Sequence, residues 1–226
     1  TMGTPQPWSK ENTPPGPRKS PGPNPNNKKN NQPDKSKLPD VPDTKGNIEK
    51  PNIYIYSDYQ RDVSVLFDNP EYVTVSEPIY PVDGGWQVNV DQEGVIDGEY
   101  GFLYYEAQAE AKGYQYQYGW KIPAGTRCEE LERVLRLYAF NDAETRDFLE
   151  YWVQRLKPGM DYTMFPQETH AVDAVMPVQI SPCPQSVHRI WFIFLEGIQP
   201  HVTEPEQVEK FLRKPYTVIE WGGIVE

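Results

Sequence analysis

Apolar and polar side chains alternate along several stretches of the first half of the chain, which is the period of β-strands with one buried face. The alternation is clearest where Tyr114, Tyr116 and Tyr118 are separated by single glutamines. Prolines within residues 71–81 mark an edge strand or a strand exit. We therefore predict strands at residues 52–57, 61–68, 71–81, 86–97 (a hairpin turning at Glu93-Gly94), 99–108 and 114–122.

A helical spacing of apolar residues replaces this alternation after residue 125. Thr126 and Glu129 have the spacing of a capping box, and Asn141 or Asp142 can cap a second helix. We expect the two helices to form a pair over residues 126–157 that packs on the sheet. Its apolar positions are Leu131, Val134, Leu135, Tyr138, Phe148, Leu149, Trp152, Val153 and Leu156.

Strand signals then return, which predicts a single α+β domain with mostly antiparallel sheet. The segment "RIWFIFL" is apolar on both faces, so we place it centrally in a sheet. The last strand is expected to return beside an early one. The predicted elements are strands at residues 161–168, 174–180, 189–197 and 216–223, with a short helix at 204–215.

The N-terminal part differs from the rest in composition. Residues 1–50 hold 11 of the 24 prolines, with nine basic and five acidic side chains. The remaining residues carry 13 basic and 28 acidic side chains, so the net charge of −11 divides into about +4 and −15. A segment with so few apolar residues cannot offset its ordering entropy. We predict a disordered spacer at residues 1–49 and one globular domain at 50–226.

The charge of the domain argues against nucleic acid as a partner, because phosphate binding requires a basic face. No apolar run approaches the roughly 20 residues of a transmembrane helix. A basic spacer rich in Lys, Asn and Pro is typical of a secreted domain held away from its anchor, with an intracellular linker as the alternative. These features favour an extracellular or cell-envelope location.

Few residues suggest metal or nucleophilic chemistry. Cys128 and Cys183 could pair in an exported protein, or remain isolated buried thiols. The three histidines, His170, His188 and His201, lie in different parts of the chain without a zinc or triad pattern. No glycine-rich phosphate loop or nucleophile motif is present, so the sequence predicts no metal site and no cofactor.

Several motifs together resemble an uncharacterised family of secreted and lipoprotein-like proteins from Gram-positive gut bacteria. "EKPNIYIYSD" with "DVSVLFD" is similar to that family's "KPVIYLYP…VSVKLD" opening, and "YTVIEWGG" is similar to its "FTVVEWGG" close. "YPVDGGWQVNVDQEGVI", "YGFLYYEA" and "DFLEYWVQRLKPGMDYTMFPQE" resemble its intermediate stretches. The resemblance covers residues 50–223. It implies a cell-envelope location and contributes no activity.

Four carboxylates at predicted strand ends are the candidates for catalysis: Glu106, Glu168, Glu196 and Glu220. Two carboxyl groups held roughly 5–10 Å apart can hydrolyse a glycosidic bond, and burial without a cation raises the pKa of a carboxyl that acts as an acid. The structural alternative is that each caps a strand, accepts backbone hydrogen bonds, or pairs with Arg189 or Arg155.

Aromatic residues are the candidates for binding. A ring can stack on the apolar face of a sugar or on a peptide side chain, while tyrosine also suits an ordinary half-buried strand. Glu220 and Trp221 before two glycines could line a groove, or Trp221 could plug the end of the sheet. The candidate binding residues are Trp86, Tyr105, Tyr114, Tyr116, Tyr118 and Trp221.

These observations favour a non-enzymatic exported or cell-surface domain that binds a protein or a glycan. The alternatives are a carboxylate-based glycan hydrolase and a purely structural module of a larger surface protein. The hydrolase requires at least two of the four carboxylates to face one cleft.

Overall fold

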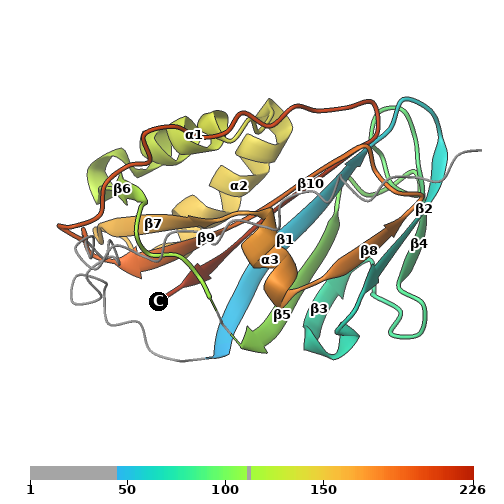
Figure 1. The fold of residues 1–226 in the computed structure, drawn as a ribbon, viewed down its shortest axis with the longest axis horizontal. Helices are drawn as coiled ribbons and strands as arrows, with labels where there is room; N and C mark the ends of the chain where they lie inside the picture. The colour runs from blue at the N-terminus through green and yellow to red at the C-terminus, as the bar shows by residue number, and fades with distance from the viewer. Residues whose placement is uncertain (1–44, 111–112) are drawn as a thin grey trace, which may run out of the picture. The chain divides into compact units, whose positions relative to one another are not determined.

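A seven-stranded sheet forms the centre of the computed structural model, which describes residues 45–110 and 113–226 (Figure 1). Only β9 and β10 pair in parallel; the other neighbours are antiparallel. The spatial order is β3 (Val73–Glu77), β5 (Leu103–Glu110), β1 (Lys45–Tyr56), β10 (Thr217–Val225), β9 (Ser186–Glu196), β7 (Tyr162–Gln167) and β6 (Trp120–Ile122).

A second sheet and a short helix pack on one face of the large sheet. The small sheet has the order β4 (Trp86–Val90), β2 (Arg61–Phe67) and β8 (Val178–Ser181), and the helix is α3 (Thr169–Val175). Val65 and Trp86 of the small sheet share one core with Ile53, Tyr105 and Trp191 of the large sheet. Alternate residues of the large strands therefore point into this core.

Two longer helices, α1 (Arg127–Leu137) and α2 (Asp142–Arg155), cover the opposite face (Figure 1). Leu135 and Trp152 from these helices pack with Phe192 and Trp221 from the sheet in a second core. The predicted helix pair and the α+β class are confirmed. Two short 3-10 turns, η2 (Pro70–Tyr72) and η3 (Ala124–Thr126), precede β3 and α1.

The predicted capping box at Thr126 does not form, whereas Asn141, predicted as a possible cap, forms a capping box with Glu144. The Asn141 side chain accepts a hydrogen bond of 2.9 Å from the Glu144 backbone, and the Glu144 carboxylate accepts one of 2.9 Å from the Asn141 backbone. Thr126 stands at the N-cap of α1 but its side chain makes no capping bond. The 3-10 turn that ends at Thr126 leads directly into α1.

The central position of the segment "RIWFIFL" is confirmed, because β9 lies between β10 and β7. The return of the last strand is confirmed as well: β10 pairs with β1, placing Ile53 opposite Glu220. The strand β3 stands at an edge of the sheet, as the prolines after it indicated. Most of the predicted strands are thus present with shifted ends. The second arm of the hairpin predicted at 86–97 is reduced to isolated bridges at Ile96, and the strand predicted at 174–180 begins only at Val178, after α3.

Two predicted elements are wrong, and one helix was not predicted. Residues 114–118 are irregular apart from a bridge between Tyr118 and Thr203. A side chain, not the backbone of a neighbouring strand, bonds to backbone groups here. The Gln115 amide donates to the carbonyls of Tyr118 and Pro166 at 3.0 and 2.8 Å. Residues 204–215 are extended instead of helical, and residues 169–175, not predicted as a helix, form α3.

The predicted spacer, residues 1–49, lies outside the described residues except for Lys45–Glu49, which begin β1. Ile48 is buried in the core, so the predicted domain boundary at residue 50 falls inside a strand. None of the helices in residues 45–110 and 113–226 has the length and apolar character needed to cross a bilayer.

Candidate functional site

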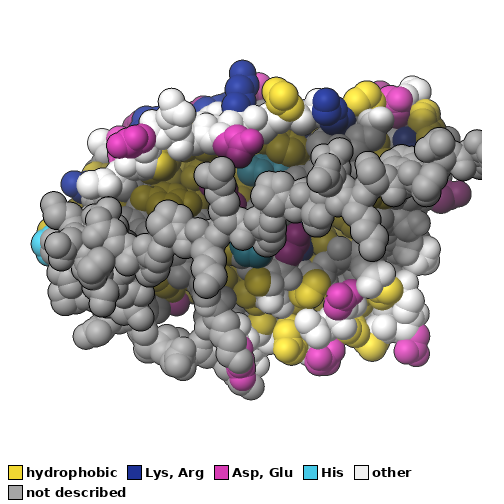
Figure 2. Space-filling view, in the orientation of Figure 1, with side chains coloured by type: hydrophobic (Ala, Val, Ile, Leu, Met, Phe, Trp, Pro, Cys, Tyr) yellow, Lys and Arg dark blue, Asp and Glu magenta, His cyan; other side chains and the backbone are white. Residues whose placement is uncertain are grey.

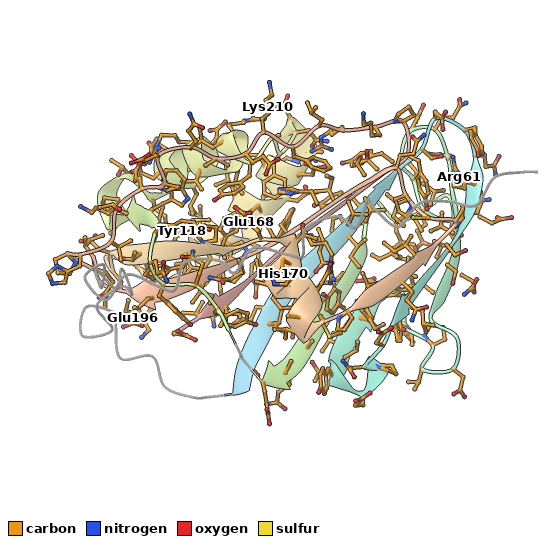
Figure 3. All side chains as sticks on the ribbon, viewed as in Figure 1. Arg61, Tyr118, Glu168, His170, Glu196 and Lys210 are labelled. Carbon is orange, nitrogen blue, oxygen red and sulfur yellow. The ribbon has the colours of Figure 1, made fainter. Side chains whose placement is uncertain are left out.

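Two of the four candidate carboxylates, Glu168 and Glu196, lie at separate places in the fold (Figure 3). Glu106 accepts a hydrogen bond of 2.6 Å from Tyr104, and Glu196 pairs with Lys157. Glu196 is in register with the first residue of β7, whereas Glu168 follows the last one. The strand β7 is six residues long, so its two ends are about 17 Å apart. Glu168 and Glu196 are therefore too far apart to act as a glycosidase pair.

Glu220 lies inside the protein as part of a hydrogen-bonded ion pair. Its side chain and that of Arg189 are each 1% exposed, with Arg189 Nε donating to Glu220 Oε2 at 2.7 Å. Tyr105 and Trp191 donate to Glu220 Oε1 at 2.8 and 2.9 Å. Arg189 also donates to Asp173 of α3 at 2.5 Å. The pairing of Glu220 with Arg189, one of the structural alternatives above, is confirmed.

The glycines of the "EWGG" segment make room for neighbouring rings. A Cβ on Gly223 would overlap the Trp152 ring, and one on Gly222 would lie 3.0 Å from Pro51 and Trp191 side-chain atoms. Trp221 is fully buried and packs edge-on against Phe148. The segment therefore packs against side chains on both faces of the sheet. This agrees with the structural alternative for the motif, in which Trp221 packs in the sheet and does not line a groove.

Trp86 and Tyr105 also belong to the core. Trp86 is 2% exposed, donates from Nε1 to the Pro78 carbonyl at 2.9 Å and packs against Tyr80. Tyr105 is fully buried with its hydroxyl on Glu220. Neither ring presents a face to solvent on which a ligand could stack.

The tyrosine run of residues 114–118 lies half-buried against the first core. Tyr114 and Tyr116 pack on that core, and the Tyr116 hydroxyl donates to the Glu226 carboxylate at 3.2 Å. Burial and the charge of Glu226 raise the pKa of both hydroxyls. Tyr118 is not among the residues packed on that core, and the run is not a strand.

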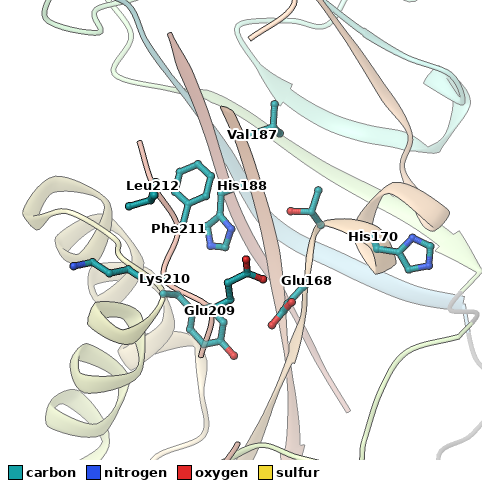
Figure 4. Close-up of a pocket in the computed structure, with 10 residues that line it drawn as sticks. Glu168, His170, Val187, His188, Glu209, Lys210, Phe211 and Leu212 are labelled. Carbon is teal, nitrogen blue, oxygen red and sulfur yellow. The ribbon is translucent and has the colours of Figure 1, made fainter. Parts of the chain in front are cut away.

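A different group of residues forms a pocket of about 430 Å³ beside the extended segment 203–215, which we call the strap. The strap connects β9 to β10, and the pocket lies between it, the start of α3 and β9 (Figure 4). Its lining residues are Tyr138, Glu168, Thr169, His170, Val187, His188, Glu209, Lys210, Phe211 and Leu212.

Glu168 and Glu209 bring two carboxylates into this pocket from opposite sides (Figure 4). Neither carboxylate makes a hydrogen bond or ion pair with a described residue, whereas Lys210 extends away from them and His170 lies on the far side of α3 (Figure 4). Desolvation and the charge of Glu209 raise the pKa of Glu168, although the residue remains accessible to solvent. The two carboxylates repel each other across an open space.

Aromatic rings form the inner wall of the pocket. His188 stacks on Phe211 with ring centroids 4.7 Å apart and on Tyr138 at 6.4 Å. Burial, together with the positive charge of Arg213, lowers the pKa of His188 to about 4. The ring is therefore neutral near pH 7, and its buried Nε2 has no hydrogen-bond partner among the described residues. The wall is largely apolar beside a negatively charged mouth.

Ion pairs near both ends hold the strap, and with it one wall of the pocket, in place. Arg213 donates to both carboxylate oxygens of the fully buried Glu144 at 2.9 and 2.5 Å. Near the other end, Glu204 accepts from Arg133 of α1 at 3.0 Å. Phe211 and Val208 pack on the second core between these anchors.

Sequence reasoning found one member of this pocket among the candidates, Glu168, and missed Glu209, His188 and Phe211 as its partners. The predicted helix at 204–215 obscured the strap, and no spacing rule relates residues on β9, α3 and a distant loop. In the described ranges, no group of three or more His, Cys, Asp or Glu could hold a metal ion. Cys128 and Cys183 are both exposed and unpaired, so neither the disulfide nor the buried-thiol expectation holds.

The fold and this pocket define an α+β domain with a pocket of carboxylates and aromatic rings. No protein-family model, curated protein or solved structure matches the chain. The resemblance noted from the sequence motifs therefore stays a prediction.

Proposed function

We propose that this chain is a non-enzymatic binding domain and that the pocket beside the strap takes a cationic side chain from a protein partner. The observation that carries the proposal is the pair of carboxylates, Glu168 and Glu209, that face each other in the pocket and form no ion pair with a described residue; Lys210 of the lining extends away from both. An opposite charge placed between two carboxylates favours their ionised forms and removes their repulsion.

The aromatic wall fits the rest of such a ligand. Lysine and arginine carry an apolar stem behind the charge, and that stem can pack on Phe211 and His188 while the charge stays near the carboxylates. A cation near the ring of Tyr138 gains a further attraction from the face of the ring. The volume of about 430 Å³ is within the range of small-ligand pockets.

The proposal favours a protein over a glycan because the pocket is acidic at its mouth. A neutral sugar gains no charge interaction from the two carboxylates, whereas a basic side chain pairs with both. We further propose that the partner is met at the cell envelope. This location rests on the composition of residues 1–49 and on the motif resemblance.

Binding of a lysine peptide tests the proposal. We expect a short peptide with one central lysine to bind in isothermal titration calorimetry, and its norleucine analogue to bind at least about tenfold more weakly, a difference of roughly 1.4 kcal/mol. The double variant Glu168→Gln/Glu209→Gln is expected to lose this preference. Because the pKa of Glu168 is raised, acidification should protonate it early and weaken lysine binding as pH falls.

Glu206→Gln provides the matched control, since Glu206 is an exposed strap carboxylate outside the pocket lining. It should leave the lysine preference unchanged. Equal binding of the lysine and norleucine peptides, or no effect of the double variant, would refute the proposal that the pocket of Glu168 and Glu209, which we call the cation pocket, binds a cation. Hydrolysis of a cell-wall glycan by the wild-type chain that is lost in the double variant would replace it with the enzyme hypothesis.

A further inference from the structure

A second surface, at the edge of the seven-stranded sheet, exposes apolar side chains that belong to no pocket described so far. Val75, Ile79 and Val82 are 48%, 84% and 65% exposed, and they are three of the six large apolar residues exposed among the described residues. All three line one groove of about 390 Å³, together with Pro70, Val73, Thr74, Ser76 and Tyr80. We call this surface the β3 groove. Figure 2 shows apolar side chains among carboxylates where Figure 1 places β3 and β8.

Hydrogen bonds to buried groups hold the segment that follows β3 in place, and its apolar residues face solvent. The hydroxyl of the buried Tyr80 accepts a hydrogen bond of 2.9 Å from the Phe67 backbone, and the Tyr80 backbone donates to Ser76 at 2.8 Å. Trp86 donates to the Pro78 carbonyl at 2.9 Å. Ile79 lies between these anchors. Exposed apolar side chains held in one arrangement are typical of an interaction surface, because little ordering entropy remains to be lost on binding.

The groove follows an edge strand. In the sheet order β3 has β5 on one side and no described strand on the other. An edge strand offers its outward backbone groups to an added strand, and side-chain grooves beside it select the residues of the ligand. An extended segment is therefore the backbone shape that this surface fits best.

Charge selects among possible occupants. No charged residue lines the groove, but the exposed carboxylates Glu71, Glu77 and Asp83 lie within two residues of its lining. A second copy of the chain would bring these carboxylates against their equivalents, and an anionic membrane would be repelled as well. An apolar segment with basic residues at its ends satisfies both the groove and its surroundings.

We propose that the β3 groove binds an extended segment of a protein partner, apolar at its centre and basic at its flanks. Its apolar residues would cover Val75, Ile79 and Val82, and its backbone would pair along the outer edge of β3. This surface is separate from the cation pocket, and the inference does not rest on the function proposed for that pocket.

Two fluorescent peptides of alternating valine and threonine test this inference, one with lysine and the other with glutamate at each end. Fluorescence anisotropy is expected to show at least tenfold tighter binding of the lysine-flanked peptide. Amide hydrogen exchange should slow at β3 when that peptide binds. The variant Ile79→Ser/Val82→Ser changes two exposed side chains and should weaken binding at least tenfold while retaining the circular dichroism spectrum and melting temperature of the wild type.

Leu137→Ser serves as the control, because Leu137 is also exposed (41%) but lies on α1. It should bind the peptide like the wild type. Equal binding of the two peptides, or equal binding by the groove variant, would overturn the proposal. Two other results would also overturn it. If the wild type dimerises with concentration, or binds phosphatidylglycerol vesicles, and the Ile79→Ser/Val82→Ser variant does not, the groove binds a second copy of the chain or a lipid surface instead.

Discussion

Glu220 and Arg189 show how a single charged residue in a predicted strand is accommodated in a core. Each side chain is 1% exposed, and the desolvation of the two charges is offset by their mutual attraction and by donors from Tyr105 and Trp191. The negative charge of Glu220 raises the pKa of Arg189 despite the burial of the guanidinium. The pair joins β9 and β10, and through Asp173 it also holds α3.

The substitution Glu220→Gln is predicted to destabilise the protein strongly while preserving side-chain size. It leaves the buried guanidinium of Arg189 with only the half-exposed carboxylate of Asp173 as a charge partner, and breaking a buried pair costs about 3–5 kcal/mol. Urea unfolding followed by circular dichroism measures the change. Lys157→Met removes the partner of Glu196 in an exposed surface pair and should lower the free energy of unfolding far less. A loss for Glu220→Gln that is no larger than that of Lys157→Met would contradict this account.

At the scale of elements, the two predicted helix caps have different outcomes. Both have a capping residue followed three positions later by glutamate, but only Asn141 makes the reciprocal bonds with Glu144. Glu144 is further fixed by Arg213 of the strap and by the Tyr56 hydroxyl at 2.7 Å. Local sequence thus supplies a helix start, and contacts with distant elements decide whether the cap forms.

Removal of each cap gives a direct comparison. Asn141→Ala is predicted to lower the free energy of unfolding by about 0.5–2 kcal/mol, because the Glu144 backbone N–H loses its acceptor. Thr126→Ala should change it by less than about 0.5 kcal/mol, the usual range for surface substitutions. Chemical denaturation of the two variants measures both values. Equal losses would show that the Thr126 hydroxyl caps α1 in solution.

Internal periodicity predicted an element where its periodic side chains are buried together, and failed where distant contacts set the path of the chain. The spacing of Leu131, Val134 and Leu135 marked α1 because these side chains form its buried face. The strap has a helical pattern of Val208 and Phe211, yet its ends are held by ion pairs to α1 and α2 that favour an extended path. The tyrosine run alternates as a strand does, but Gln115 bonds to backbone carbonyls and prevents a ladder.

At the scale of the whole molecule, the cation pocket depends on the crossing of segments that are far apart in sequence. Glu168 comes from the end of β7, His188 from β9 and Glu209 from the strap. The sequence identified Glu168 as a strand-end carboxylate, but the parallel pairing of β9 with β10 requires a long connection, and the course of that connection sets the partner of Glu168. No local pattern determines that course.

The start of the folded domain provides the last prediction. Residues 1–44 are expected to be dispensable for stability because of their composition, so their deletion should leave the melting temperature within about 2 °C of the full chain, a change below roughly 1 kcal/mol. Deleting residues 1–48 should lower it by about 4–8 °C, since it removes roughly 2 kcal/mol of buried side chain at Ile48. That residue is 1% exposed and pairs in register with Ala107 of β5.

Differential scanning calorimetry of the two truncated chains separates the outcomes. Equal melting temperatures would mean that the first strand adds nothing before Glu49, and a drop already at residue 44 would mean that the spacer stabilises the domain.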